Sequence, residues 1–219
     1  MLTIVLTRHG HTSRSEPEQY LGQSIDISLD ELGRKAALDL RGRLDGISFE
    51  QVIASPLKRA RETAALARPT DTIETDERLK EADYGDWEGL TAEEIERRWP
   101  DVRAFWEADP ATFTIPGGES GQDVARRVRS FVEQLVEWEA AMDRPATDHR
   151  VLVVAHSTVN RVLLASVLGV PIRDYRRRFR QDWANLTVLR YAEPLGSGAE
   201  LLLANDVAHI RGLQGVTWG

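Results

Sequence analysis

Short hydrophobic runs alternate with stretches of helical periodicity along most of the chain. Residues 2–7 are apolar and too few for a helix, so they predict a buried strand. Residues 51–54 and 151–155 predict two further strands, and residues 71–75 predict a weaker one. Strands that alternate with helices are typical of a parallel sheet with helices on both faces. We therefore expect an α/β fold of three layers, α/β/α, with a mostly parallel central sheet.

Helical patterns follow the predicted strands. Residues 30–45 predict a helix, and Asp30 is a suitable N-cap. The apolar face of this helix carries Leu32, Ala36 and Leu40 at helical spacing. Capping residues predict where two further helices begin, because their side chains can accept hydrogen bonds from the free backbone N–H groups of a helix start.

Two pairs of residues mark these starts. Ser55 and Pro56 predict an N-cap and a first-turn proline for a helix that reaches about Ala67. Ser120 and Asp123 resemble a capping box in front of a long apolar stripe. One predicted helix start follows a strand and the other follows a loop. Strands and helices are therefore expected to alternate both before and after the middle segment of the chain.

Residues 84–118 interrupt this alternation. They hold two short helical patterns on either side of Pro100, followed by a loop that ends in Pro-Gly-Gly. We expect Trp99 and Trp106 to pack within this segment. The chain, 1–219, is then expected to be one domain in which 84–118 forms an inserted, cap-like segment near the carboxyl ends of the strands.

The last part of the chain contains a basic run and two segments that predict strands. Residues 186–191 and 201–204 predict strands joined by a turn that contains Gly and Ser. Residues 173–180 are rich in Arg, and we expect a solvated helix face paired with acids of the middle segment. The alternative is a surface that receives an acidic substrate tail. We expect His149 at the surface and His209 in a structural role.

Composition narrows the classes of protein. The chain has 219 residues and a net charge of −7, so nucleic acid and anionic membrane are poor partners. It has no cysteine, which excludes disulfides, thiolate metal sites and cysteine nucleophiles. No run is long and apolar enough to span a bilayer, and the first strand is too short for a signal peptide. We therefore expect a cytoplasmic protein.

Two predicted strands end in a histidine. The first runs into Arg8 and His9, and the strand at 151–155 runs into His156. Ligands bind at this carboxyl edge in open α/β sheets. A histidine beside an arginine stays neutral more readily, so its free nitrogen can attack phosphorus. A lone histidine at a strand end is more often a hydrogen-bonded structural residue, so these residues alone leave both interpretations open.

Two other segments carry candidate chemistry. Arg59 falls in the first turn of the helix after the strand at 51–54. It belongs either to a solvated basic face or to a phosphate site at a helix N-terminus. Residues 79–89 place several carboxylates in a loop with Gly and aromatic residues. In isolation these are surface charges, but beside a phosphoryl group one carboxyl can be held protonated and can give its proton to a leaving alkoxide.

Seven motifs, in order from Arg8 to about Ile210, resemble those of the histidine phosphatase superfamily, also called the phosphoglycerate-mutase-like family. One such motif is weak, whereas seven in the family's order are specific. They are Arg8-His9-Gly10-His11-Thr12, Asp26 through Gly33-Arg34, Ser55-Pro56-Leu57-Lys58-Arg59-Ala60, Leu79-Lys80-Glu81, Gly85-Asp86-Trp87-Glu88-Gly89, Gly117-Gly118-Glu119-Ser120 and Val154-Ala155-His156-Ser157.

The resemblance implies a metal-independent phosphomonoesterase that acts on a small phosphorylated metabolite. It implies that His9 is the nucleophile and becomes phosphohistidine. It implies that Arg8, Arg59 and His156 hold the phosphoryl oxygens. Glu81 would be the proton donor to the leaving group and the base that activates water. Neither a cofactor nor a metal is expected, and a homodimer is an open alternative because dimers are common among relatives.

The chain departs from the family pattern at the expected rim of the pocket. The family often has Glu at the position of His11, Asn at that of Ser15, and Gln-Gly in place of Gly22-Gln23. We take His11, Ser15, Gln23 and Tyr84 as candidate specificity residues. His11 either faces solvent or contacts substrate.

Two alternative functions stay open. A phosphoglycerate mutase that depends on 2,3-bisphosphoglycerate tends to be longer in the middle and more basic after the catalytic Glu. Here residues 84–89 are acidic and aromatic, which favours the phosphatase branch. A non-catalytic module that binds phosphorylated ligands would be expected to lack His9 or Glu81, and this chain has both.

Overall fold

The computed structural model describes residues 1–142, 148–191 and 198–210. Within these residues, six strands form one mixed sheet in the order β3-β2-β4-β1-β5-β6. The strands are β1 (Leu2–Arg8), β2 (Gln51–Ala54), β3 (Ile73–Thr75), β4 (His149–Ala155), β5 (Leu186–Tyr191) and β6 (Glu200–Asp206). The pairs β1–β4, β2–β4 and β2–β3 are parallel, whereas β5 pairs antiparallel with both β1 and β6.

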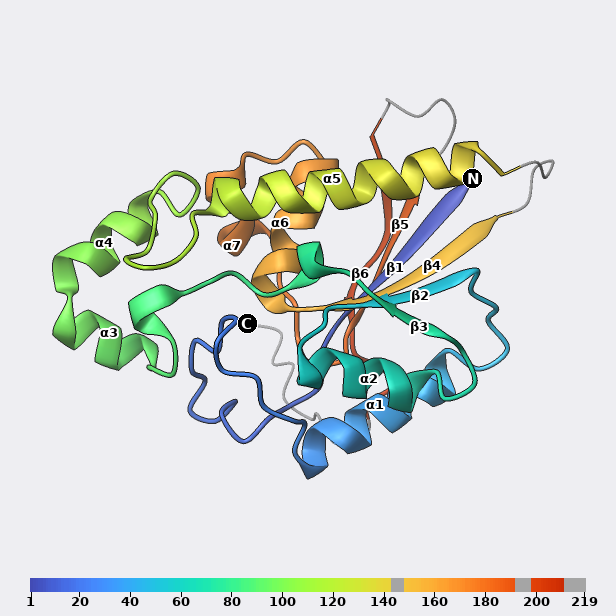
Figure 1. Cartoon of the computed structure of the whole chain (residues 1–219), viewed down its shortest axis with the longest axis horizontal. Helices are drawn as coiled ribbons and strands as arrows, with labels where there is room; N and C mark the ends of the chain where they lie inside the picture. The colour runs from blue at the N-terminus through green and yellow to red at the C-terminus, as the bar shows by residue number, and fades with distance from the viewer. Residues whose placement is uncertain (143–147, 192–197, 211–219) are drawn as a thin grey trace.

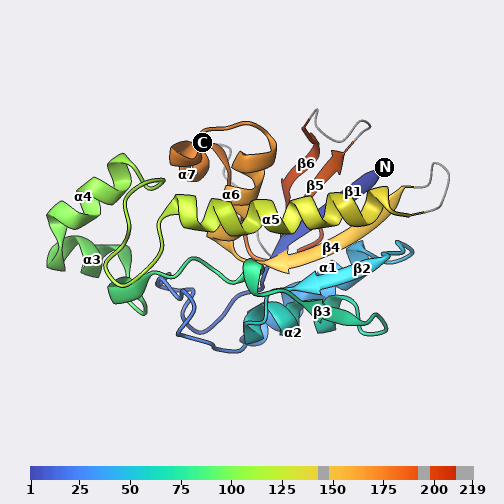
Figure 2. The same cartoon turned by 45° about the horizontal axis from the view of Figure 1, so that its top comes forward.

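Helices cover both faces of this sheet, as Figures 1 and 2 show. The helices are α1 (Glu31–Arg43), α2 (Lys58–Ala67), α3 (Ala92–Arg98), α4 (Pro100–Ala108), α5 (Gly121–Ala140), α6 (Ser157–Val167) and α7 (Tyr175–Arg178). Three short 3₁₀ turns are η1 (Glu77–Leu79), η2 (Gly85–Trp87) and η3 (Ile172–Asp174). Helices α1 and α2 lie on one face, and α5 and α6 on the other. The expected α/β fold with a mostly parallel sheet is therefore confirmed.

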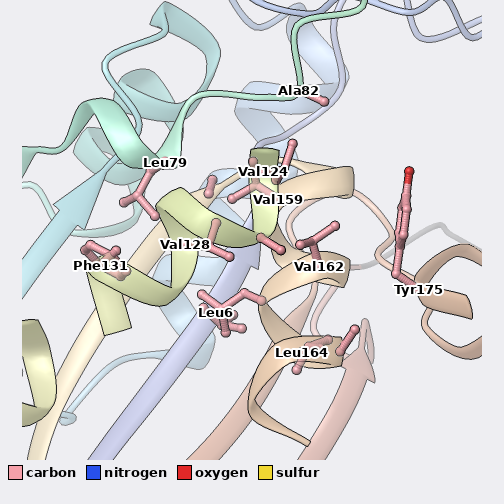
Figure 3. Packing of buried hydrophobic residues seen from close by; sticks show 14 of the residues in the cluster. Leu6, Leu79, Ala82, Val124, Val128, Phe131, Val159, Val162, Leu164 and Tyr175 are labelled. Atoms are coloured by element: carbon pink, nitrogen blue, oxygen red, sulfur yellow. The ribbon is translucent and has the colours of Figure 1, made fainter. Parts of the chain in front are cut away.

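The alternating side chains of β1 supply both halves of the core. Leu2, Ile4 and Leu6 belong to the cluster on the α5–α6 side, whereas Val5 belongs to the cluster on the α1–α2 side. Figure 3 shows Leu6 beneath side chains that α5 and α6 direct at each other. A strand buried on both faces is mostly apolar, and the polar residues of β1 that are buried, Thr3 and Thr7, are threonines whose side chains carry one methyl group each. Each buried leucine, isoleucine or valine side chain stabilises the fold by roughly 1.5–3 kcal/mol.

The register of the parallel strands aligns their carboxyl ends. Arg8 lies opposite Ala155 across the β1–β4 pair. The next residues along the two strands, His9 and His156, therefore leave the sheet side by side, because neighbouring strands are about 4.8 Å apart. Ser55 follows β2 on the other side of β4, so three polar residues emerge together at one edge.

Helix α2 begins later than the sequence suggested. We expected Ser55 as its N-cap, but the helix starts at Lys58, with Leu57 in the capping position. The hydroxyl of Ser55 lies 2.7 Å from Nε2 of His156, so it contributes to the site at the sheet edge. The side chain of Asp26 takes over part of the capping, since its carboxylate accepts a hydrogen bond of 2.6 Å from the backbone N–H of Lys58.

Three further expectations about burial were wrong. Leu32 is 62% exposed, because the buried face of α1 starts at Gly33, one residue further around the helix. His149 is buried at 2% exposure, because β4 begins at this residue and its ring packs near Trp138. Residues 173–180 form a 3₁₀ turn, one turn of α-helix and an extended segment, so they do not present a single solvated helix face.

The segment between β3 and α5 extends past the carboxyl ends of the parallel strands, where Figure 1 shows α3 and α4 at one end of the molecule. Helix α3 opens with a capping box at Thr91, and α5 opens with the expected one at Ser120. Trp106 is buried, and Trp99 packs against the same core cluster. None of the described helices is long and apolar enough to cross a bilayer.

A close backbone contact joins α1 to the loop after β1. A Cβ placed on Gly33 would lie 2.1 Å from the carbonyl oxygen of His11, and one placed on Gly10 would lie 2.6 Å from the carbonyl oxygen of Gly33. Only glycine fits at such a distance, because backbone cannot move aside as a flexible side chain can. The first turn of α1 therefore presses directly on the loop that holds His9.

We expect Gly33→Ala to lower the free energy of unfolding by about 1–3 kcal/mol, because the new methyl group overpacks this contact. Gly42→Ala is the matched control in the same helix, since a Cβ there meets no atom within 4 Å. It should raise the free energy of unfolding by up to about 1 kcal/mol through helix propensity. Urea unfolding of both variants measures the difference, and equal effects would contradict the close packing.

Candidate active site

His9 lies directly after β1 and is only 4% exposed. Its backbone N–H donates to the carbonyl of Ala155, 3.0 Å away, which extends the β1–β4 ladder by one residue. Its Nδ1 lies 2.7 Å from the carbonyl oxygen of Gly10. A carbonyl can only accept, so Nδ1 carries the hydrogen and Nε2 is left with its lone pair. This tautomer presents an unprotonated nitrogen, as a nucleophile requires.

His156 is fully buried beside His9. The centroids of the two rings are 5.1 Å apart, and their planes are tilted by 58°. Nε2 of His156 lies 2.7 Å from the hydroxyl oxygen of Ser55. Nδ1 is buried and has no hydrogen-bond partner among the residues that the structure describes. Such a nitrogen needs a polar partner, and a bound oxyanion would supply one.

Burial and neighbouring cations hold both imidazoles neutral. Desolvation, followed by the positive charges of Arg59 and Arg8, lowers the pKa of His9 well below its ordinary value. Desolvation, followed by the charge of Arg59 and the proximity of His9, does the same to the pKa of His156. Both rings are therefore uncharged at neutral pH, and the net positive charge of the site comes from its arginines.

Arg59 is a buried cation without a carboxylate partner in the described part of the chain. It lies in the first turn of α2 and is 1% exposed. Its guanidinium donates to the carbonyls of Gly22, at 2.9 Å, and Ile25, at 3.1 Å, while its Nε is buried and unpaired. Carbonyls fix the orientation of the side chain without neutralising it, so its full charge is available to an anion.

Arg8 is held on several sides. Its guanidinium donates to the carbonyl of Gln181, at 3.0 Å, and to the carboxylate of Glu18, at 2.6 Å. It also lies over the ring of Trp183, 5.1 Å from the centroid. Glu18 is largely exposed, so its ion pair with Arg8 is weak and a more highly charged oxyanion can replace it.

Glu81 faces the same site from the loop after η1 and is 6% exposed. Its carboxylate accepts hydrogen bonds from the backbone N–H groups of Ala82 (2.8 Å), Thr158 (3.2 Å) and Val159 (3.3 Å). The last two belong to the first turn of α6, which follows His156. The N-terminus of a helix favours a carboxylate, so α6 fixes Glu81 beside the two histidines.

The loop that carries Glu81 is clamped by Arg127, which lies on α5. The guanidinium of Arg127 donates to the carbonyls of Arg78 and Lys80, both at 2.6 Å, and to that of Glu81 at 3.1 Å. It also forms an ion pair with Glu119 at 3.0 Å. This role could not be predicted from the sequence, because the carbonyls that Arg127 binds lie 46 to 49 residues away along the chain.

A pocket of about 260 Å³ opens over this site. Of the residues singled out from the sequence, the pocket is lined by Arg8, His9, Ser15, Arg59, Glu81 and Tyr84. The ring of His156 does not line it and lies behind, against His9 and Ser55. Four further arginines also line the pocket: Arg14, Arg103, Arg161 and Arg176. Only Arg176 belongs to a segment considered from the sequence, the run 173–180, whose alternative was a surface that receives an acidic substrate tail.

Two candidate specificity residues do not line the pocket. Nδ1 of His11 lies 2.5 Å from a carboxylate oxygen of Asp30, and its ring packs edge-on against Trp183, so it neither faces solvent nor contacts the pocket. The amide of Gln23 donates to the carbonyl of Glu81 at 2.9 Å, so it supports the loop of the acid. Ser15 and Tyr84 do line the pocket, and the Tyr84 hydroxyl lies 2.6 Å from that of Thr158 on α6.

The described residues contain no group of three or more His, Asp and Glu side chains that is arranged to hold a metal ion. The chemistry that the geometry offers is that of an unprotonated imidazole, two guanidinium groups and one carboxyl group around one pocket. This arrangement suits transfer of a phosphoryl group, whose negative charge is spread over three equatorial oxygens.

A sequence model of the histidine phosphatase superfamily (branch 1) matches residues 4–206, and the chain belongs to this superfamily. Relatives of the chain are named as phosphatases. The glucosyl-3-phosphoglycerate phosphatase of Mycobacterium tuberculosis is 37% identical over 178 residues, which cover 78% of this chain and 78% of that protein. Phosphoserine phosphatase 1 of Hydrogenobacter thermophilus is 30% identical over 198 residues, which cover 88% of each protein.

Solved structures share the fold. A mycobacterial glucosyl-3-phosphoglycerate phosphatase in complex with VO₃ matches with a TM-score of 0.81 and 32% identity, over 93% of this chain and 98% of that one. The expected family and fold class are confirmed by these findings. The expected class of enzyme is confirmed as well: the chain is a phosphoric monoester hydrolase.

The neutral histidines make stability sensitive to acid. In the unfolded chain an imidazole binds a proton below about pH 6.5, whereas the lowered pKa of His9 keeps it neutral in the folded chain. The unfolded state therefore binds more protons, and stability falls as the pH drops below about 6.5. His9→Asn should reduce this slope by about 1.4 kcal/mol per pH unit. Urea unfolding from pH 7.5 to 5 measures it, and an unchanged slope would show that folded His9 is protonated.

Proposed function

We propose that this chain hydrolyses the phosphate monoester of a small metabolite, without a metal ion, through a phosphohistidine formed on His9. The observation that carries the proposal is the state of His9: Nδ1 is committed to the carbonyl of Gly10, and Nε2 is unprotonated in a ring that lines the pocket. The guanidinium groups of Arg8 and Arg59 line the same pocket, so the positive charge that phosphate requires is next to the nucleophile.

In the first step, Nε2 of His9 attacks phosphorus and the bond between phosphorus and the ester oxygen breaks. Glu81 gives its proton to the departing alkoxide, which leaves as an alcohol. Arg8 and Arg59 bind the equatorial oxygens, where negative charge is greatest in the transition state. The proposed contact of His156 with the phosphoryl group uses its Nδ1, which has no partner among the described residues. The ring lies behind His9, so the phosphoryl group has to reach past the pocket lining to meet it.

In the second step, water attacks the phosphorus of phosphohistidine and the bond between phosphorus and nitrogen breaks. Glu81, now a carboxylate, takes the proton from this water, so it returns to its starting state. The products are inorganic phosphate and the free alcohol. One carboxyl group serves both steps because its position is fixed by the N-terminus of α6 and by the loop that Arg127 clamps.

The segment 84–118 supports substrate selection in this proposal, as a cap-like insertion in a single domain. Tyr84, Ala92 and Arg103 of this segment line the pocket. Ser15 lines it from the loop after β1. These residues line the pocket together with His9, and in this proposal they contact the alcohol portion of the substrate.

Substitution of the nucleophile tests the proposal. We expect His9→Asn to lower hydrolysis of p-nitrophenyl phosphate in EDTA by at least about a thousandfold, the scale of losing a covalent nucleophile. Protein that is mixed with labelled substrate and then denatured in alkaline detergent should carry phosphate only when His9 is present, because a phosphorus–nitrogen bond survives base and is cleaved by acid.

His209→Asn is the control for this experiment, because His209 lies outside the pocket with Nε2 2.9 Å from the carbonyl oxygen of Ala184. It should keep the activity of the original chain. Comparable activity in His9→Asn would refute the proposal, and turnover only with a bisphosphoglycerate primer would favour the mutase.

Substitution of the acid tests the role of Glu81. We expect Glu81→Gln to slow an alkyl phosphate by about a hundredfold to ten-thousandfold, because an alkoxide needs a proton to leave. The effect on p-nitrophenyl phosphate should be much smaller, since p-nitrophenolate leaves unprotonated. The measurement is kcat/KM for both esters, and an equal loss on both would remove Glu81 from this role.

A further inference from the structure

The pocket holds more positive charge than transfer of one phosphoryl group requires. Among the described residues that line it are six arginines and two carboxylates. The arginines are Arg8, Arg14, Arg59, Arg103, Arg161 and Arg176, and the carboxylates are Glu18 and Glu81. Glu18 pairs with Arg8, and the charge of Glu81 acts on Arg59, so neither carboxylate is a partner of Arg161 or Arg176.

Partners account for two of these other arginines. Arg14 donates to the side-chain oxygen of Gln19 at 2.8 Å. Arg103 forms an ion pair with Glu107 at 2.7 Å and donates to the hydroxyl of Tyr20 at 2.6 Å. Arg14 is exposed, and Arg59 belongs to the phosphoryl site. The two arginines that remain, on α6 and α7, are partly buried and make no ion pair with any described residue.

The first of the two is Arg161, on α6. It lines the pocket together with Ser157 and Thr158, because residues three and four apart share one face of a helix. Its Nε is buried and has no hydrogen-bond partner in the part of the chain that the structure describes. Thr158 on the same face donates its N–H to Glu81, so Arg161 lies on the side of the pocket from which the proton donor acts.

The second is Arg176, on the single turn of α7. Its guanidinium carbon lies 4.4 Å from the centroid of the Trp106 ring, within the range of a cation–π contact. This contact uses the face of the guanidinium, and one N–H at its edge is engaged by a side-chain hydrogen bond with Tyr175. Neither partner is a carboxylate, so the charge of Arg176 is not neutralised by them. The expectation that the run 173–180 is solvated was therefore wrong for Arg176.

The two guanidinium groups are close enough to affect each other. Burial, together with the positive charge of Arg176, lowers the pKa of Arg161. Two like charges in a partly desolvated pocket repel each other unless an anion lies between them. A planar guanidinium binds the two oxygens of a carboxylate or phosphate at once, so a pair of them suits an oxyanion well.

We propose that Arg161 and Arg176 form a second anion subsite, which binds an oxyanion on the portion of the substrate that leaves as the alcohol. The substrate is then a phosphate monoester that also carries a carboxylate or a second phosphate. This inference rests on the proposed function, because it assigns the first anion site to the transferred phosphoryl group.

Inhibition of p-nitrophenyl phosphate hydrolysis tests the subsite, because it does not require the probe to be a good substrate. Glycerol 3-phosphate and 3-phosphoglycerate differ only in a carboxylate that replaces a hydroxymethyl group, and propane-1,3-diol bisphosphate offers a second phosphate. We expect 3-phosphoglycerate or the bisphosphate to have an inhibition constant at least about tenfold below that of glycerol 3-phosphate, the gain from one charged hydrogen-bonding pair. The tighter of the two identifies the oxyanion.

The quantity compared across variants is the inhibition constant of glycerol 3-phosphate divided by that of the tighter doubly anionic probe. A change in basal turnover does not affect this ratio. Arg176→Gln and Arg161→Gln should each bring the ratio close to one, and Arg176→Lys should restore part of it. Arg177→Gln is the matched control, because Arg177 is the next residue along and is exposed. It should keep the ratio of the original chain.

Two results would overturn the inference: equal inhibition constants for all three probes in the original chain, or a ratio that both Gln variants leave unchanged. Failure of the proposed function looks different. In that case the original chain does not release p-nitrophenol and forms no phosphohistidine. A chain that does both, yet shows no preference for the second anion, retains its proposed function and lacks only the subsite.

Discussion

The in-register parallel pairing of β1 with β4 is the constraint on which the site depends. Because Arg8 lies opposite Ala155, the residues that follow, His9 and His156, leave the sheet at neighbouring positions and their rings come within 5.1 Å. A shift of the pairing by one residue would turn every side chain of β1 to the other face. Both faces of β1 pack into apolar cores, so burial of the strand and placement of the histidines reinforce each other.

The electrostatics of the site follow from how its cations are held. Backbone carbonyls orient Arg59, and the partly exposed partner of Arg8 is an acid that an oxyanion can replace. Cations held in this way keep their charge for a ligand, and they also keep the nearby imidazoles neutral. The same physical feature thus provides affinity for phosphate and an unprotonated nucleophile, and the carboxylate that phosphate has to displace, that of Glu18, is largely exposed.

The pocket is lined by two kinds of segment. His9 follows a strand end and Arg59 lies in the first turn of a helix, so the packed sheet positions both. Arg103 of α4, Arg161 of α6 and Arg176 of α7 line the same pocket, and the ring of Trp106 lies against the guanidinium groups of Arg103 and Arg176. On a shared fold, the residues of the site decide the function. Relatives of the chain are accordingly named for different substrates, glucosyl-3-phosphoglycerate and phosphoserine.

The sequence by itself determined the elements and the candidate residues at the strand ends, because apolar periodicity, capping residues and strand-terminal histidines are local signals. These signals predict the α/β class and mark His9 and His156 as candidate site residues, although they do not show that the two rings lie close together. Only the tertiary structure decided that Ser55 faces His156 instead of capping a helix, that Arg127 clamps the loop of the acid, and that Arg176 stacks in the pocket. Ser55 and His156 are 101 positions apart along the chain, and Arg127 is 47 positions from Lys80. Arg176 and Trp106 lie on separate helices. Local sequence patterns carry no information about such distant pairs.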